Sequence, residues 1–194
     1  MRKDALYSIP CLICFFSFYL GCGEAGDTKK KILFEQMQNV RAKEREIGRF
    51  DKTNYYDLCY LGFTYFSDAV MKKDMDNPEH RTDIQKALEF YSKAVAINKK
   101  LPNAYKGLFR VYYFSGDYKN ALKNIKIAIE KDKGDFDAVF MLGNFYYQEG
   151  DLTSALEWFE KAKEILNNKP TFLSTPERKR FNQMIEKIKK KRGE

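Results

Sequence analysis

The 194-residue sequence has few of the residues on which many metalloenzymes and extracellular mini-proteins depend. It contains one histidine, His80, one tryptophan and four cysteines. A single histidine excludes a metal centre built from several imidazoles, and four cysteines are too few for a disulfide scaffold of this length. Hydrophobic residues make up 44% and charged residues 32%. This composition excludes a disordered or collagen-like chain and a polytopic membrane protein, and it leaves a globular body.

Positive charge is unevenly distributed along the chain. The formal net charge is +8, but residues 55–176 are neutral overall, whereas residues 29–54 carry about +4 and residues 177–194 about +5. A nucleic-acid binder would more often spread Lys and Arg over its main surface. Two interpretations stay open for the basic ends: solvated helix faces, or attraction to anionic lipid headgroups or an acidic partner.

The first 22 residues have the layout of a secretory signal. Arg2 and Lys3 give a positive start, and residues 5–20 are free of charge and rich in apolar side chains. Sixteen residues reach about 24 Å as a helix, which is short of a bilayer core of about 30 Å. The stretch ends in Leu20-Gly21-Cys22-Gly23. These features predict a cleaved segment rather than a membrane-spanning helix.

The Gly21-Cys22 junction resembles the lipobox of bacterial lipoproteins. In that family the cysteine receives a diacylglycerol and becomes the first residue of the mature chain. The resemblance therefore implies lipidation of Cys22, a signal peptide over residues 1–21, a tether over residues 22–28, and a location in the bacterial cell envelope, on the inner or outer membrane. The alternative is an ordinary cleaved signal with an incidental cysteine.

A repeat of 34 residues organises the rest of the chain. Alanine pairs seven residues apart recur at this offset, as Ala87 and Ala94, Ala121 and Ala128, and Ala155 and Ala162. A large side chain lies four residues after the first alanine of each pair, namely Tyr91, Ile125 and Phe159. Asp83, Asp117 and Asp151 precede the pairs by four residues, where an Asp can accept hydrogen bonds from the first turn of a helix.

Each repeat unit predicts a helical hairpin. Apolar residues recur with the period of an α-helix on both sides of a turn that Gly116-Asp117 and Gly150-Asp151 mark. Alanine where two helices cross lets the backbones approach, and the neighbouring ring fills the space beside it. A hairpin of this size cannot bury its apolar face alone, so the units are expected to stack.

The pattern closely resembles the tetratricopeptide repeat (TPR) family. The resemblance implies an all-α, right-handed α-solenoid of about three TPR hairpins. It places the repeats at residues 55–169, as units 55–101, 102–135 and 136–169. The first unit carries thirteen extra residues, placed at 70–82. Its polar composition, the only histidine and the sequence Asp76-Asn77-Pro78 predict an exposed loop there.

Two flanking helices are expected to complete the array. Residues 29–54 place Ile32, Leu33, Met37 and Val40 on one face and predict an N-terminal helix. Residues 170–194 predict a capping helix, with Phe181, Met184, Ile185 and Ile188 facing the last repeat. Its outer side forms a basic surface made of Arg178, Arg180, Lys187, Lys190 and Lys191.

The first helices of TPR hairpins line the concave face of the array, so the register of each unit predicts a peptide groove. The groove candidates from the three units are Tyr56, Cys59, Phe63, Phe66, Asn103, Lys106, Arg110, Tyr113, Asp137, Phe140, Asn144 and Tyr147. The aromatic side chains would anchor a partner, and Lys106 and Arg110 could pair with a partner carboxylate. Packing of several of these rings in the core is the competing interpretation.

The function that these features favour is that of a lipid-anchored adaptor. It would bind a protein or peptide of unknown identity and support the assembly or regulation of an envelope complex. The sequence offers no catalytic motif, metal-ligand set or cofactor site, and no nucleic-acid partner is expected. The alternative is a cell-wall-active enzyme, or a regulator of a peptidoglycan hydrolase.

Overall fold

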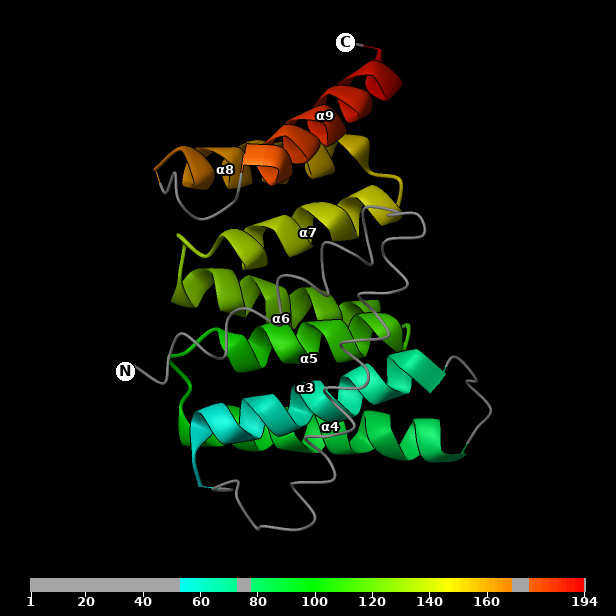
Figure 1. The fold of residues 1–194 in the computed structure, drawn as a ribbon, viewed down its shortest axis with the longest axis vertical. Helices are drawn as coiled ribbons and strands as arrows, with labels where there is room; N and C mark the ends of the chain where they lie inside the picture. Colours follow the sequence, from blue (N-terminus) through cyan, green and yellow to red (C-terminus); the bar gives the residue numbers. More distant parts are fainter. Residues whose placement is uncertain (1–52, 73–77, 169–174, 194) are drawn as a thin grey trace.

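The computed structural model describes residues 53–72, 78–168 and 175–193. These ranges contain seven α-helices and no strand, which confirms the predicted all-α fold. The helices are α3 (Tyr55–Lys72), α4 (Pro78–Ile97), α5 (Asn103–Phe114), α6 (Tyr118–Lys131), α7 (Phe136–Gln148), α8 (Leu152–Asn168) and α9 (Thr175–Arg192). They form a stack along one axis, in which successive pairs of helices follow one another in chain order and α9 lies at the far end (Figure 1). Cys22 and the predicted N-terminal helix lie outside the described residues.

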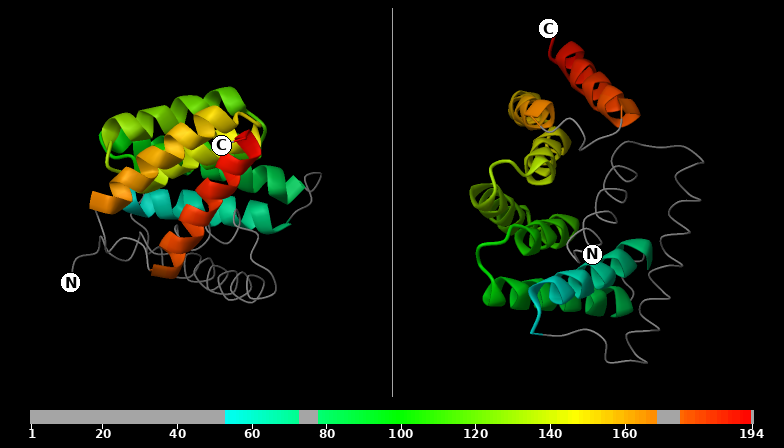
Figure 2. Two further views of the ribbon diagram at one scale, coloured as in Figure 1. Left: turned by 90° about the horizontal axis from the view of Figure 1, so that it is seen from above. Right: turned by 60° about the vertical axis from the view of Figure 1, so that its left-hand side comes forward.

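The helices pair into three hairpins, α3–α4, α5–α6 and α7–α8, which we call repeats 1, 2 and 3. Figure 2 shows α3, α5 and α7 along the inner side of a curved array and α4, α6 and α8 along its outer side. Each hairpin also packs on the first helix of the next unit, and α8 packs on α9. The buried side chains fall into three clusters, and each cluster joins a hairpin to the following helix. The core is therefore a series of junctions, as the stacking of hairpins requires.

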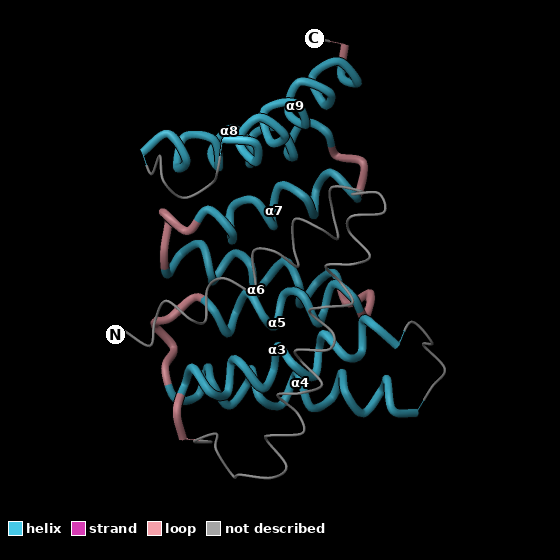
Figure 3. Tube along the Cα trace, in the orientation of Figure 1, coloured by secondary structure: helices cyan, strands magenta, loops and turns pink. Residues whose placement is uncertain are grey.

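Glycine and aspartate build the tight turns inside repeats 2 and 3, which appear as short loops in Figure 3. Gly116 and Gly150 have φ of 76° and 82°, a left-handed conformation that costs glycine little. The next residue caps the second helix in both cases. Asp117 accepts a hydrogen bond from Asn120 N at 3.1 Å, and Asp151 accepts one from Ser154 N at 3.0 Å. Both predicted caps are confirmed.

The predicted alanine crossings are also confirmed. All six alanines of the repeat pattern are fully buried: Ala87, Ala94, Ala121, Ala128, Ala155 and Ala162. The large side chains after them face glycines in repeats 1 and 3. A Cβ added at Gly62 would lie 3.0 Å from the Tyr91 ring, and one added at Gly143 would lie 2.8 Å from the Phe159 ring. Small and large residues thus interlock between the two helices of a hairpin.

The thirteen extra residues of repeat 1 mainly lengthen its helices. Helices α3 and α4 have 18 and 20 residues, against 12 and 14 in repeat 2. The prediction of an exposed loop over 70–82 is therefore wrong for its helical parts, because α3 continues to Lys72 and α4 begins at Pro78. His80 is only 3% exposed and its ring lies 5.7 Å from that of Phe114.

The early start of α4 also changes the place of Asp83. This residue lies inside the helix and is buried, so the prediction that it caps the second helix of repeat 1 is wrong. The cap geometry needs a residue that precedes the first turn. In repeat 1 the extra helical residues occupy that position instead.

Helix α9 closes the array. Phe181, Ile185 and Ile188 are at most 1% exposed and join the core formed by α7 and α8, while Met184 packs at its margin. The predicted apolar side of the C-terminal helix therefore faces the last repeat. This contact fixes which side of α9 points to solvent.

Candidate functional site

The predicted groove residues lie on the inner face formed by α3, α5 and α7. They differ in exposure: some are buried, most are half-buried and one is exposed. Lys106, Phe140 and Asn144 are buried. Asn103 is exposed, and the others are half-buried, namely Tyr56, Cys59, Phe63, Phe66, Arg110, Tyr113, Asp137 and Tyr147. The half-buried group offers surface to a partner, whereas the three buried side chains offer little.

Phe140 belongs to the core, so its assignment to the groove is wrong. Its ring stacks on Phe136 with centroids 5.5 Å apart, and it lies 5.5 Å from Phe159 and 5.6 Å from Phe181. The reason is α9, which brings Phe181 against α7 and α8 and covers this position. Asn144 follows Phe140 by one helical turn and is 5% exposed, so it offers no open anchor either.

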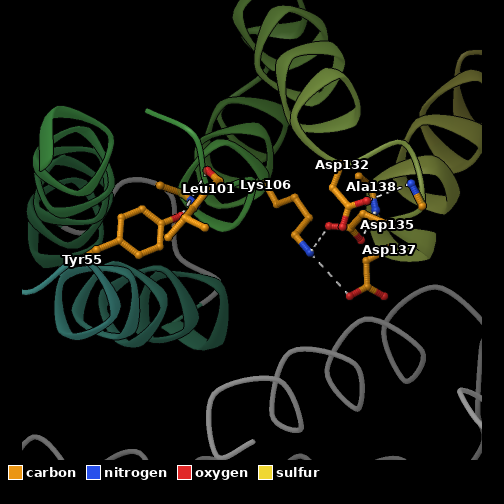
Figure 4. Close-up of polar contacts among 9 residues, drawn as sticks. Tyr55, Leu101, Lys106, Asp132, Asp135, Asp137 and Ala138 are labelled. Carbon is orange, nitrogen blue, oxygen red and sulfur yellow. Dashed lines mark hydrogen bonds and ion pairs between the residues drawn. The ribbon is translucent and has the colours of Figure 1, made fainter. Parts of the chain in front are cut away.

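Lys106 joins repeat 2 to repeat 3 (Figure 4). Its Nζ lies 2.7 Å from Asp135 Oδ2 and 3.7 Å from Asp137 Oδ2, and its side chain is 10% exposed. The prediction that Lys106 is available to pair with a partner carboxylate is therefore wrong, because Asp135 and Asp137 of the same chain already neutralise its charge. Asp135 also caps α7, since its Oδ1 accepts a hydrogen bond from Ala138 N at 3.2 Å.

Asp137 lies in a partly buried and charged part of the inner face. Burial raises the pKa of the Asp137 carboxyl above its ordinary value, while the positive charges of Lys106 and Arg110 lower it in part and Asp135 raises it further. Two cations and two carboxylates therefore meet between α5 and α7. The middle of the inner face is internally compensated rather than cationic.

A different contact joins repeat 1 to repeat 2. The Tyr55 hydroxyl donates a hydrogen bond to Leu101 O at 3.2 Å and accepts one from Ala104 N at 2.9 Å, at the start of α5 (Figure 4). Burial is the main reason why the pKa of Tyr55 is raised, so the hydroxyl stays neutral. Sequence reasoning missed Tyr55 because no equivalent tyrosine recurs at the repeat offset.

Aromatic side chains remain accessible at the end of α5. Tyr113 stacks on Phe109 at 5.8 Å and lies 5.4 Å from Tyr118 and 5.8 Å from Phe145. Tyr118 is 44% exposed. The sequence reasoning overlooked Tyr118 because it considered only the first helix of each hairpin, whereas this residue begins α6.

The α3 part of the inner face is also aromatic. Tyr56, Phe63 and Phe66 are half-buried and pack along the margin of the repeat 1 core. Phe66 meets Phe114 of α5 edge to face, with centroids 5.7 Å apart. These rings combine packing with partial exposure, which is the pattern of anchor positions at protein interfaces.

The predicted basic surface on α9 divides into engaged and exposed residues. Arg178 donates a hydrogen bond to Leu166 O at 2.9 Å, and Lys191 donates one to Tyr147 OH at 3.2 Å. Arg180, Lys187 and Lys190 are exposed. Two further lysines belong to this surface. Lys179 is exposed, whereas Lys189 is half-buried and its Nζ lies 2.9 Å from Glu160 Oε1.

Two other kinds of site are absent from residues 53–72, 78–168 and 175–193. No group of three or more His, Cys, Asp or Glu side chains is arranged to hold a metal ion in these ranges. None of the helices in the same ranges combines the length and apolar character that a bilayer crossing requires.

The architecture and the inner face define a class, the helical repeat scaffolds, in which stacked hairpins present one long surface. Residues 107–170 match the family model described as tetratricopeptide repeat. These residues run from α5 to the end of α8, so the family model covers most of repeats 2 and 3 of the array. The chain has no significant match among curated protein sequences.

Solved structures support the same fold. TTC0263, a thermophilic TPR protein of Thermus thermophilus, is 15% identical with a TM-score of 0.60, over 93% of this chain and 81% of that one. A MamA protein is 20% identical with a TM-score of 0.51, over 93% and 83%. Human IFIT1, solved as a dimer with PPP-AAAA, is 17% identical with a TM-score of 0.58, over 97% of this chain and 42% of that one. Identities this low establish the fold alone.

Proposed function

We propose that the chain is a lipid-anchored adaptor of the bacterial cell envelope that binds a segment of another protein along its inner face. The TPR fold supports a role as a protein–protein interaction scaffold, and TPR proteins are typically not catalytic. The lipid anchor and the envelope location rest on the sequence pattern, and the binding face rests on the surface chemistry of the inner helices.

The observation that carries the proposal is the row of half-buried aromatic side chains on α3, α5 and α7. Phe63, Phe66 and Tyr113 keep part of their surface open although they lie in well-packed surroundings. Aromatic anchors of this kind contribute most of the binding energy of many interfaces. Because Lys106 is already paired, we expect a partner held mainly by apolar side chains, with Arg110 and exposed Asn103 adding polar contacts.

Site-specific photocrosslinking in cells tests the binding face without truncating a packed ring. A photoreactive amino acid replaces Asn103 or Arg110 on the inner helix α5. Matched positions on the outer helices are exposed Lys126 of α6 and Lys161 of α8. We expect discrete protein adducts from the two inner positions and not from the outer ones. Equal adducts from both sides, or adducts from the outer side alone, would overturn the assignment of the inner face.

A second variant tests the anchors themselves. Arg110→Ala combined with Tyr113→Ala should reduce recovery of the crosslinked partner in a pull-down from native membranes. Tyr113 also packs against Phe109 and Phe145, so thermal unfolding must show that the variant still folds. Full recovery of the partner by the folded variant would show that these residues do not form the groove.

The lipid anchor depends on Cys22 and is tested separately. We expect the wild-type protein expressed in a bacterial host to partition into the detergent phase of Triton X-114, and Cys22→Ser to move it to the aqueous phase. A Cys59→Ser variant is the matched control, because it removes a cysteine that no lipobox-like sequence precedes. Partitioning that is unchanged in Cys22→Ser would exclude acylation at this residue.

A further inference from the structure

Helix α9 has more positive charge than a capping role requires. It carries eight Lys and Arg residues and two Glu residues. A cap needs a polar outer side for solubility, and alternating charges would serve that purpose equally well. The excess of positive charge therefore indicates a negatively charged partner outside the repeat array.

The packing of α9 on repeat 3 determines which way its basic side chains point. Phe181, Ile185 and Ile188 are buried against repeat 3, so the opposite side of α9 faces solvent. At 3.6 residues per turn, Lys179, Arg180, Lys187 and Lys190 fall within an arc of about 100° on that opposite side. They extend over about 17 Å of the helix axis at 1.5 Å per residue. We call these four residues the basic stripe.

Intramolecular contacts account for other basic residues of α9 but not for the stripe. Lys189 pairs with Glu160, Lys191 bonds Tyr147, and Arg178 bonds Leu166 O. The four stripe residues are exposed and form no ion pair within the described part of the chain. The side of α9 that carries the stripe also holds Asn182, Gln183 and one acidic residue, Glu186.

The chemistry of the stripe selects one kind of partner. A peptide site needs apolar anchors, and sequence-tolerant binding of single-stranded nucleic acid needs aromatic stacking platforms. The only aromatic residue of α9, Phe181, is buried, and the residues flanking the stripe are polar, such as Asn182 and Gln183. A hydrated cluster of four cations without apolar anchors fits a flat anionic surface, because charge alone attracts such clusters to acidic lipid headgroups.

We propose that α9 is a membrane-contact helix whose basic stripe, Lys179, Arg180, Lys187 and Lys190, docks on an anionic lipid bilayer. The contact is electrostatic and leaves Phe181, Ile185 and Ile188 in the core. It is a separate function from partner binding on the inner face, and it needs no acyl group on Cys22. Where that lipid is present, the stripe would hold one end of the array against the bilayer surface.

Vesicle sedimentation with the full, unacylated chain tests the proposal. The vesicles contain phosphatidylcholine alone, or phosphatidylcholine with phosphatidylglycerol in a 7:3 ratio. The stripe variant changes Lys179, Arg180, Lys187 and Lys190 to Gln. The control variant removes the same charge from four exposed lysines elsewhere, by changing Lys100, Lys123, Lys126 and Lys133 to Gln. Thermal unfolding verifies that both variants fold.

We expect the wild type and the control variant to bind the anionic vesicles with similar affinity, and the stripe variant to bind about tenfold more weakly or worse, since clustered basic residues each contribute to such binding. Raising the salt concentration from 0.1 to 0.5 M should abolish the difference, because salt screens exposed charges. The neutral vesicles measure any background from the apolar N-terminal residues. Equal losses in the two variants, or no preference for anionic vesicles, would overturn the proposal.

Competition with two soluble polyanions distinguishes binding to a membrane from binding to other anionic partners. Poly-glutamate and poly(A) are added as competitors at the same concentration of negative charge as the vesicle surface. The proposal predicts that neither displaces the wild type more effectively than the anionic vesicles themselves do. Preferential displacement by poly-glutamate would assign the stripe to an acidic protein, and preferential displacement by poly(A) would assign it to RNA.

Discussion

The two junctions between repeats solve the same packing problem with different chemistry. The first junction, between repeats 1 and 2, places the Tyr91 ring against Gly107 and adds the neutral hydrogen bonds of the Tyr55 hydroxyl. The second junction, between repeats 2 and 3, has Ile125 and Met141 at the positions 34 residues further on, in one buried cluster. It adds the ion pair of Lys106 with Asp135. The repeat pattern therefore determines which positions fill a junction between repeats. The two junctions fill these positions with side chains of different size and add different polar contacts.

Breaking the ion pair should have the largest effect. Lys106→Ala leaves Asp135 and Asp137 desolvated without their nearest cation, and loss of one partner of such a buried pair costs about 3–5 kcal/mol in free energy of unfolding. Urea denaturation measures this cost. Lys106→Met combined with Asp135→Asn and Asp137→Asn is the matched control, because it removes the cation and both carboxylates together while Asn still caps α7. A single variant as stable as the triple variant would show that the ion pair is not part of the junction's stability.

Filling the glycine of the first junction should have the next largest effect. A Cβ at residue 107 would lie 2.2 Å from the Tyr91 ring, so Gly107→Ala forces the two helices apart and should cost about 1–3 kcal/mol. Changing Tyr91 to Ile as well introduces the smaller side chain that the second junction uses at this position, and it should recover part of the loss. If the two changes are simply additive in a thermal unfolding cycle, the close approach of Tyr91 and Gly107 is not the cause.

The hydrogen bonds of Tyr55 should contribute less, and in a way that salt does not alter. Tyr55→Phe removes the hydroxyl that bonds Leu101 O and Ala104 N, and should cost about 1–2 kcal/mol. The cost should be the same in 0.1 M and 1 M NaCl, because the substitution removes no charge that salt could screen. A cost that changes with the salt concentration would show that Tyr55 does not act through neutral hydrogen bonds.

The sequence predicts most of the fold because the relevant signals are local and periodic. Ala121 and Ala128 lie seven residues apart on one helix, and the turn residues Gly116 and Asp117 are adjacent in the chain. Each of these signals can be read without knowing what the helix packs against. The same is true of the apolar side of α9, where Phe181 and Ile185 are four residues apart.

The candidate site is less predictable because exposure depends on contacts between distant segments. Phe140 has the register of a groove residue, but α9 brings Phe181 against it from 41 positions further along the chain. Lys106 meets Asp135 only because the α6–α7 turn returns to α5. Neither contact recurs at the repeat offset, so the alignment of units could not reveal it. The register identifies the inner face, and only the packing separates its open residues from its covered ones.

The smallest expected effect is a difference in pH dependence. The contribution of Asp137 to stability should change with pH in the opposite direction to that of the helix cap Asp151. Burial raises the pKa of Asp137, so its contribution to stability is present below the unfolded value of about 4 and is lost as the pH rises through the folded value. Hydrogen bonds from Ser154 lower the pKa of Asp151, so its cap has the opposite dependence and is lost as the pH falls below about 4. Measured against the wild type by urea denaturation, Asp137→Asn should therefore become relatively more stable between pH 4 and pH 7, and Asp151→Ala relatively less stable. Parallel curves for Asp137→Asn and the wild type would show that the carboxyl titrates alike in the folded and unfolded chain, and that the second junction does not desolvate it.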